Sequence, residues 1–211
     1  MKILLIGYGN VNRIIYRQNQ ENVVGIIGLN NEYVTEIPDV IIDFSHSNML
    51  DKTIHYATKY NIPVVFGTTG YNAENMAKIK ELSKIVPIIK NENFSSGIHM
   101  IKKILINNKK QLTTYDKEIV ETHHKDKKDS PSGTALMLAN MLDTNNIKSI
   151  REGDVVGIHE LIFRNENEEV SIIHRMKSRI SFAEEAVMCA RWLMNKLPGY
   201  YKYEDFFEFR I

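Results

Sequence analysis

The first twenty residues restrict the possible folds more than any other part of the chain. A run of Ile and Leu at 2–6 is typical of a short strand buried on both faces. A Gly-x-Gly sequence at 7–9 and a helical pattern follow it. This order is the dinucleotide-binding arrangement, in which a pyrophosphate lies at the helix N-terminus. Because Asn12 replaces the third glycine of that motif, an ordinary strand-turn-helix remains the alternative.

Strands and helices alternate through the rest of the first 90 residues. Strand patterns occur at 23–27, 38–45, 63–66 and 86–89, and helical patterns at 48–60 and 72–84. The alternation predicts an α/β fold with a Rossmann-like, doubly wound parallel sheet. The connection between the second and third strands has only about nine residues, whereas a parallel crossover usually needs a dozen or more. We therefore expect an extended crossover or a lost helix there.

Glycine-containing or polar segments follow several of the predicted strands. They are Gly7, Ser45, the segment 67–69 and the segment 91–94. Each alone is typical of a polar turn. Because ligands bind beyond the carboxyl ends of the strands in such sheets, their joint placement predicts one ligand-binding edge.

The end of the second predicted strand bears on the choice of nicotinamide cofactor. An acidic residue that binds the ribose is expected about 20 residues beyond the glycines. Asn30 or Glu32 is suitably placed, and no Arg or Lys is close by in the sequence to pair with a 2′-phosphate. The cofactor is therefore NADH or NADPH, and the sequence favours NADH.

The pattern changes after about residue 95. Helical patterns are found at 96–112 and 182–196, and strand patterns at 115–122, 155–163 and 170–174. A polar turn joins the last two strands, which indicates a hairpin. We expect a second, smaller α+β domain here, and we expect the aromatic tail from Pro198 onward to pack back on the first domain.

The segment 121–135, E-T-H-H-K-D-K-K-D-S-P-S-G-T-A, carries the chemistry of the second domain. Histidine charge changes near neutral pH, and lysine is a flexible point charge with three donors. Ser132 is a good N-cap for a helix that extends to about Asp143, and a helix N-terminus suits a carboxylate or phosphate. A solvated loop is the alternative, but the position between a strand end and a helix start favours a site. The segment predicts binding and protonation of a small, multiply anionic substrate.

Composition limits the other possible functions. The net charge is +1, which gives no general reason to expect a nucleic acid or an acidic membrane as partner. The single cysteine, Cys189, lies in an apolar helical pattern, so we expect a buried thiol, no intrachain disulfide and no metal site. No apolar run reaches about 18 residues, and the start has no cleavable leader pattern, so the expected compartment is the cytoplasm.

Seven motifs in order resemble the 4-hydroxy-tetrahydrodipicolinate reductase family, also called dihydrodipicolinate reductase, of diaminopimelate and lysine biosynthesis. They are G-Y-G at 7–9, I-D-F-S at 42–45, G-T-T-G at 67–70, N-F-S-x-G at 93–97, E-x-H-H-x-x-K-x-D-x-P-S-G-T-A at 121–135, G-x-H at 157–159 and H-R-x-x-S-R-x-x-F-A at 174–183. The segment 121–135 is the most specific of them.

The resemblance implies an activity and roles for particular residues. The family reduces a cyclic dicarboxylate with a nicotinamide hydride and releases water. His123 matches the proton donor, Lys127 its partner and His124 a substrate-binding residue, while Gly133 and Thr134 match a cradle for a substrate carboxylate. The positions that match cofactor contacts are Gly7, Tyr8, Gly9, Asn10, Val11, Asn12, Gly67, Thr68, Thr69, Asn91, Glu92, Asn93 and Phe94.

The resemblance also implies a domain arrangement and an assembly. Residues 1–95 and 183–211 would form the dinucleotide-binding domain, and 96–182 the substrate-binding and oligomerisation domain. A homotetramer joined through the sheet of the second domain is expected. The chain departs from the family pattern at Asn12, at Asn30 and Asn31, in the short second crossover and at Glu185, where a glycine is usual.

Two other functions remain open. Another nicotinamide enzyme of similar build, such as an amino-acid dehydrogenase, would not need the paired histidines followed by P-S-G-T. A catalytically inactive relative that senses a dinucleotide or a dicarboxylate would account for the short crossover and Asn12, but not for the intact His-His-Lys set.

Overall fold

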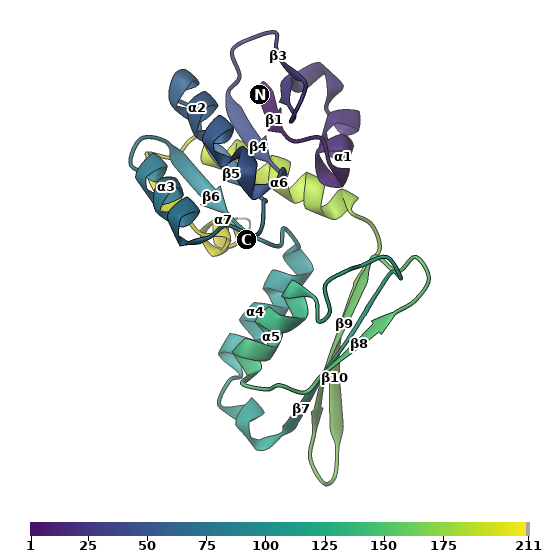
Figure 1. Ribbon diagram of the computed structural model, residues 1–211. Coiled ribbons are helices and arrows are strands. Elements are labelled where there is room, and N and C mark those ends of the chain that lie inside the picture. Colours follow the sequence, from purple (N-terminus) through teal and green to yellow (C-terminus); the bar gives the residue numbers. More distant parts are fainter. Residues whose placement is uncertain (210–211) are drawn as a thin grey trace. The chain divides into compact units, whose positions relative to one another are not determined.

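The computed structural model describes residues 1–209, and these form two compact units (Figure 1). The first unit contains residues 1–95 together with the chain from Arg179 onward, and the second contains Ser96–Ser178. The junction expected from the sequence is at 183, and the last two residues of that predicted domain lie outside the described part.

The first unit is built on a seven-stranded sheet in the order β11-β6-β5-β4-β1-β2-β3. Its strands are β1 (Ile3–Ile6), β2 (Val23–Ile27), β3 (Glu32–Val34), β4 (Val40–Asp43), β5 (Val64–Phe66), β6 (Pro87–Lys90) and β11 (Gly199–Tyr201). All neighbouring pairs are parallel except β2 and β3. The chain runs from β1 outward in both directions, which is the doubly wound arrangement. The predicted α/β class is confirmed.

Helices cover both faces of this sheet (Figure 1). They are α1 (Asn10–Gln18), α2 (Leu50–Tyr60), α3 (Ala73–Ser83), α6 (Ile180–Leu193) and α7 (Tyr203–Phe209), with the short 3₁₀ turns η1 (Gln20–Asn22) and η2 (Ser47–Met49). Successive residues of a strand point to opposite faces. Accordingly, Ile3 and Leu5 pack with α1, α6 and α7, whereas Leu4 and Ile6 pack with α2 and α3.

The short second crossover has a simple structural cause. Instead of a helix, the connection contains β3, which pairs antiparallel with β2 at the edge of the sheet. The chain then returns to form β4 on the other side of β1. The expected loss of a helix is therefore confirmed, and this edge pair is antiparallel because a hairpin needs fewer residues than a parallel crossover.

The aromatic tail packs on the first unit, as predicted. β11 pairs parallel with β6, and the rings of Tyr203 and Phe206 are buried in the core beside α6. The Tyr203 hydroxyl donates a 2.6 Å hydrogen bond to the buried carboxylate of Glu185. The unusual Glu185 is thus paired with the tail, which explains why a charged group is tolerated at a buried position.

The second unit contains a four-stranded sheet in the order β10-β9-β7-β8. Its elements are α4 (Ser96–Asn107), η3 (Gln111–Thr114), β7 (Asp116–His123), α5 (Gly133–Leu142), β8 (Ile147–Arg151), β9 (Gly157–Arg164) and β10 (Glu169–Met176). The predicted hairpin is the antiparallel pair β9 and β10. β8 was not expected from the sequence, and it pairs parallel with β7 after the crossover through α5. The sheet is therefore mixed.

The two faces of this second sheet differ. Ile119, Leu161 and Phe163 point to the face on which α4 and α5 pack. Their sequence neighbours must point to the opposite face. No helix described for this unit packs on that opposite face, which carries Val120, Ile150, Ile158, Ile162 and Ile173.

Candidate active site

The glycines at the strand ends of the first unit allow close packing between β1, β4 and β5. Gly7 has a φ of +84°, and a Cβ atom there would lie 2.8 Å from the Cα of Ser45. A Cβ atom at Gly67 would lie 2.2 Å from the ring of Phe44. The chain leaves β1 and β4 in opposite directions, and ligands bind at such switch points. Larger residues at these two positions would separate the loops.

Asn12 has a clear role in place of the missing glycine. It is fully buried, and its Nδ2 donates to the carbonyl oxygens of Ile6 at 2.7 Å and Gly7 at 3.0 Å. These bonds join α1 to the end of β1. A third glycine serves close helix–strand packing in the usual motif, whereas here an amide side chain makes that connection.

The first turn of α1 fits a pyrophosphate. Gly9 is the N-cap residue, and no side chain caps the helix there. The first N–H groups of a helix have no intrahelical partners, and together with the helix dipole they suit an anion. The glycines before them leave the backbone accessible, so the residues present fit a dinucleotide at the carboxyl edge of the sheet.

Asp43 joins the loops after β4 and β5. It is fully buried and accepts hydrogen bonds from the hydroxyls of Ser45, Thr53 and Thr68. Burial raises the pKa of Asp43, and these hydroxyl donors oppose that rise. The Thr68 hydroxyl also accepts from the backbone N–H of Ser45 at 2.9 Å. The side chain of Thr68 is therefore engaged in shaping this edge.

The loop after β6 is anchored in a different way. The N–H of Asn91 donates to the carbonyl of Phe66 at 3.0 Å. Phe94 is only 1% exposed, and its ring packs against Phe44 and Tyr203 with centroid distances of 5.4 and 5.7 Å. Its side chain therefore belongs to the core, which leaves its backbone for a cofactor.

A lysine that was not expected from the sequence lies at the end of β2. Glu32 accepts hydrogen bonds from the Tyr56 hydroxyl and, at 3.2 Å, from Lys52 Nζ, and Lys52 also donates to the carbonyl of Gly28 at 3.3 Å. These bonds from Tyr56 and Lys52 lower the pKa of Glu32. The inference that no cation lies near the end of β2 is wrong for the folded chain, because α2 brings Lys52 to this position.

The second unit gathers three ionisable groups, His123, His159 and Arg151, around Glu121. Glu121 and His123 are two residues apart on β7 and therefore point to the same face, and His159 lies beside Glu121 on β9. Glu121 Oε2 is hydrogen-bonded to His123 Nδ1, and Oε1 accepts from Arg151 at 2.7 Å. Glu121 is fully buried, and His123 and His159 are 8% and 5% exposed, so little water competes for these bonds.

The pKa values follow from this packing. Burial by itself raises the pKa of Glu121, but hydrogen bonds from Arg151, Ser149 and His123 outweigh it and hold the pKa at about 2. Burial lowers the pKa of His123, and the Glu121 carboxylate opposes that decrease. Burial also lowers the pKa of His159, to about 3. At neutral pH Glu121 is ionised and His159 is neutral.

The loop between β7 and α5 carries the predicted lysine. Lys127 Nζ binds both carboxylate oxygens of Asp129, at 2.7 and 2.9 Å. The N–H of His124 donates to the carbonyl of Val155, and Arg151 donates to the carbonyl of Asp129, both at 2.7 Å. The loop is thus attached to the segment that includes β8 and leads to β9.

The N-terminus of α5 confirms the predicted cap. The Ser132 hydroxyl accepts from the N–H of Ala135 at 3.2 Å, and the same oxygen lies 3.2 Å from His159 Nε2. The N–H of Ser132 donates to Glu121 Oε1 at 3.2 Å. Gly133 and Thr134 begin the helix, and a Cβ atom at Gly133 would meet nothing within 4 Å. The Gly133 N–H donates to the Asp129 carboxylate, and open space at a helix start suits a carboxylate.

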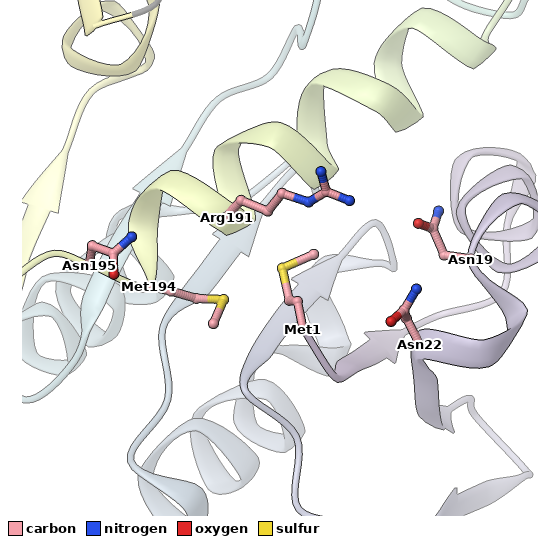
Figure 2. A pocket seen from close by; sticks show the side chains of 6 residues that line it. All are labelled: Met1, Asn19, Asn22, Arg191, Met194 and Asn195. Atoms are coloured by element: carbon pink, nitrogen blue, oxygen red, sulfur yellow. The ribbon is translucent and has the colours of Figure 1, made fainter.

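A separate pocket of about 280 Å³ lies at the other edge of the first sheet. Figure 2 shows its six lining residues, Met1, Asn19, Asn22, Arg191, Met194 and Asn195. Met1 lies two residues before β1 and Asn22 directly precedes β2, so this pocket is at the amino ends of the strands. Ligands of doubly wound sheets bind at the carboxyl ends, which excludes it as the dinucleotide site.

Within residues 1–209, no group of three or more His, Cys, Asp or Glu side chains is arranged to hold a metal ion. In the same range, no helix has both the length and the apolar character needed to cross a membrane.

Comparisons with known proteins agree with the motif order. Residues 1–94 match the family model for the dihydrodipicolinate reductase N-terminus, and residues 97–207 match that for the C-terminus. Proteins named 4-hydroxy-tetrahydrodipicolinate reductase are similar over most of their length. The one from Brachyspira hyodysenteriae is 36% identical, with 97% of this chain and 99% of the relative covered. The one from Thermosipho africanus is 41% identical, with 81% and 79% covered.

A solved structure supports the same fold. The dipicolinate-bound dihydrodipicolinate reductase from Paenisporosarcina sp. TG-14 superposes with a TM-score of 0.75 at 20% identity, with 96% of this chain and 97% of that chain covered. Two family models together span nearly all of the chain, and full-length relatives exceed 30% identity. The resemblance found in the motifs is thereby confirmed, and the chain belongs to the dihydrodipicolinate reductase family.

Proposed function

We propose that this chain is a 4-hydroxy-tetrahydrodipicolinate reductase, which reduces its cyclic dicarboxylate substrate to tetrahydrodipicolinate with NADH or NADPH. The full-length relatives that carry this name support the assignment. We propose the cytoplasm as its compartment, as expected for a biosynthetic enzyme that uses a nicotinamide cofactor. The observation that carries the proposal is the Glu121–His123 pair, hydrogen-bonded to the start of α5.

In this proposal the first unit holds the cofactor. The first turn of α1, from Asn10 to Asn12, binds the pyrophosphate, with Gly7 and Gly9 keeping the backbone accessible. The remaining contacts come from Tyr8 and Val11, from the loop Gly67, Thr68 and Thr69 and from the loop Asn91, Glu92, Asn93 and Phe94. The bound nicotinamide supplies the hydride.

The second unit binds the dicarboxylate and supplies the proton. Gly133 and Thr134 offer backbone N–H groups to one carboxylate, and His124 and Lys127 add polar and positive groups. His123 donates the proton at the position next to the one that receives hydride. A histidine is a suitable general acid near neutral pH. Lys127 must exchange its contact with Asp129 for the substrate anion in order to act.

The assay follows oxidation of NADH and NADPH by absorbance, with the substrate made in situ from pyruvate and aspartate semialdehyde by the preceding synthase. We expect oxidation that depends on the synthase. His123→Gln should lower kcat by about 10²- to 10⁴-fold, the usual contribution of a general acid. Lys127→Ala should also lower turnover strongly, and neither change should affect NADH binding. Lys128→Ala is the matched control, because Lys128 is exposed in the same loop.

Three results would contradict the proposal or the residue roles within it. Wild-type turnover in both variants would remove the roles of His123 and Lys127. Binding of NADH or dicarboxylate by a folded protein without any NADH oxidation would favour the inactive sensor. Oxidation of an amino acid with reduction of NAD⁺ would favour a dehydrogenase of similar build.

We further propose that NADH is preferred and that the enzyme is a homotetramer. A 2′-phosphate at the end of β2 would meet the Glu32 carboxylate, whose charge is only partly compensated by Lys52. For assembly, the open face of the second sheet carries several partly exposed apolar side chains, Val120, Ile150, Ile158 and Ile173 among them. Such a face is typical of a subunit interface.

A further inference from the structure

We propose that Glu121 is a positioning residue that holds the proton donor His123 and the carboxylate cradle at the start of α5 in one fixed arrangement. This inference rests on the proposed function and deepens it. It assigns a task to a side chain that touches neither cofactor nor substrate in the roles described above.

Each carboxylate oxygen of Glu121 has different partners. Oε2 binds His123 Nδ1. Oε1 accepts from the N–H of Ser132 at 3.2 Å and from Arg151 at 2.7 Å. Ser132 is the N-cap of α5, so its N–H lies directly before the cradle formed by Gly133 and Thr134. One rigid carboxylate therefore connects the two groups that must act on the same substrate.

The bond to Glu121 also fixes which nitrogen of His123 can deliver a proton. An ionised carboxylate only accepts hydrogen bonds, so His123 Nδ1 must carry the hydrogen and Nε2 remains for the transferable proton. Gly157 leaves room at that nitrogen, because a Cβ atom there would lie 3.0 Å from His123 Nε2. The arrangement resembles the carboxylate that orients the histidine in hydrolytic triads.

Arg151 allows the carboxylate to do this while fully buried. A buried charge is costly unless it is paired and hydrogen-bonded. Arg151 occupies Oε1 and also donates to the carbonyl of Asp129. This pairing keeps Glu121 ionised and leaves Oε2 for His123.

The charged and titratable groups around His123 give the sign of the pH effect. They are Glu121 on its own strand, Arg151 on β8, His159 on β9 and Lys127 in the loop, which is paired with Asp129. Burial, Lys127 and Arg151 lower the pKa of His123, whereas Glu121 raises it. Removing the charge of Glu121 therefore lowers the pKa of His123. Because a general acid must be protonated, the alkaline limit of activity should move to lower pH.

The test compares Glu121→Gln with wild type. The amide keeps the size of the side chain but has one oxygen instead of two, so it cannot serve both His123 and Ser132. We expect kcat/KM to fall about 10- to 100-fold, as when groups that orient metal-bound histidines are lost, and the alkaline limb to move to lower pH. Pyridine-2,6-dicarboxylate, measured by calorimetry, should bind more weakly. Glu166→Gln is the control, since Glu166 is an exposed carboxylate in the turn between β9 and β10.

A second readout does not depend on turnover. Histidine-labelled protein allows the titration of His123 to be followed by NMR, with His123→Gln used only to identify its signals. We expect wild type to show a hydrogen-bonded Nδ1 proton, and Glu121→Gln to titrate at lower pH. An unchanged titration of His123 together with an unchanged alkaline limb of activity would overturn the proposal. If Glu121→Gln fails to fold, the absence of the hydrogen-bonded Nδ1 proton in wild type would overturn it. A shifted titration in a protein that never oxidises NADH would reject only the reductase function.

Discussion

Side chains from distant parts of the sequence decide the chemistry of the candidate sites in both units. Lys52 reaches the end of β2 from α2, and Arg151 reaches Glu121 from β8. The motif residues themselves could be found from the sequence, because strand ends and a helix N-cap predict where polar groups gather. Their partners could not, because tertiary packing alone brings Lys52 and Arg151 to those places. Asn12 was interpreted as a weakness, since only the fold shows that its amide bonds the end of β1.

At the residue scale, Glu32 and Lys52 should set cofactor preference. Lys52→Met removes a cation near the ribose end and should lower kcat/KM for NADPH relative to NADH. Glu32→Gln removes the opposing carboxylate and should raise that ratio, by about tenfold for each 1.4 kcal/mol of changed interaction. Binding of 2′,5′-ADP against 5′-AMP measures the same effect without turnover. Lys80→Met, an exposed change on α3, is the control, and equal ratios in all three variants would remove the assignment.

The second residue-scale prediction concerns His159 and acid stability. Burial lowers the pKa of His159 from 6.5 to about 3. Between these values the unfolded chain binds a proton that the folded chain does not, so the free energy of unfolding decreases as pH falls from about 6.5 toward 3. His159→Asn should reduce the slope by at most one proton, about 1.4 kcal/mol per pH unit. Urea unfolding at several pH values measures this slope, and an unchanged slope would contradict the prediction.

At the scale of elements, prediction of strands succeeded where the apolar pattern was continuous and failed where it was interrupted or partly exposed. Buried runs such as β1, β2 and β5 were identified because strands covered on both faces read as apolar runs. β3 and β11 have three residues each, as β5 does, but they are not buried on both faces and show no continuous apolar run. β8 was missed because its I-K-S-I-R sequence spaces its two isoleucines three residues apart instead of two.

The cap of α5 gives a prediction for one element. Ser132→Ala should lower the free energy of unfolding by about 0.5–2 kcal/mol, because Ser132 accepts the Ala135 N–H. Ser132→Gly also removes the hydroxyl and its contact with His159, yet glycine is tolerated at an N-cap and should cost less. Chemical denaturation of both variants distinguishes capping from packing. A larger loss for Ser132→Gly would show that packing dominates.

At the scale of the whole molecule, the open face of the second sheet should control assembly. Ile173 is 52% exposed on that face. Ile173→Lys places a charge in the proposed interface, where desolvation is costly, and should shift the protein from four times the 24.4 kDa chain mass toward smaller species. Light scattering measures this. Leu197→Lys is the control, since Leu197 is 81% exposed in the first unit. An unchanged mass for Ile173→Lys would move the interface elsewhere.

The first unit pairs β6 with β11, two strands that lie on either side of the second unit in the sequence, and its core includes Ala183, Trp192 and Tyr203. During synthesis this core cannot close until Tyr203 and Phe206 have left the ribosome. The second unit, by contrast, is complete once Ser178 has emerged. Domains of a growing chain generally fold in order from the N-terminus, but here the unit that starts first must finish last.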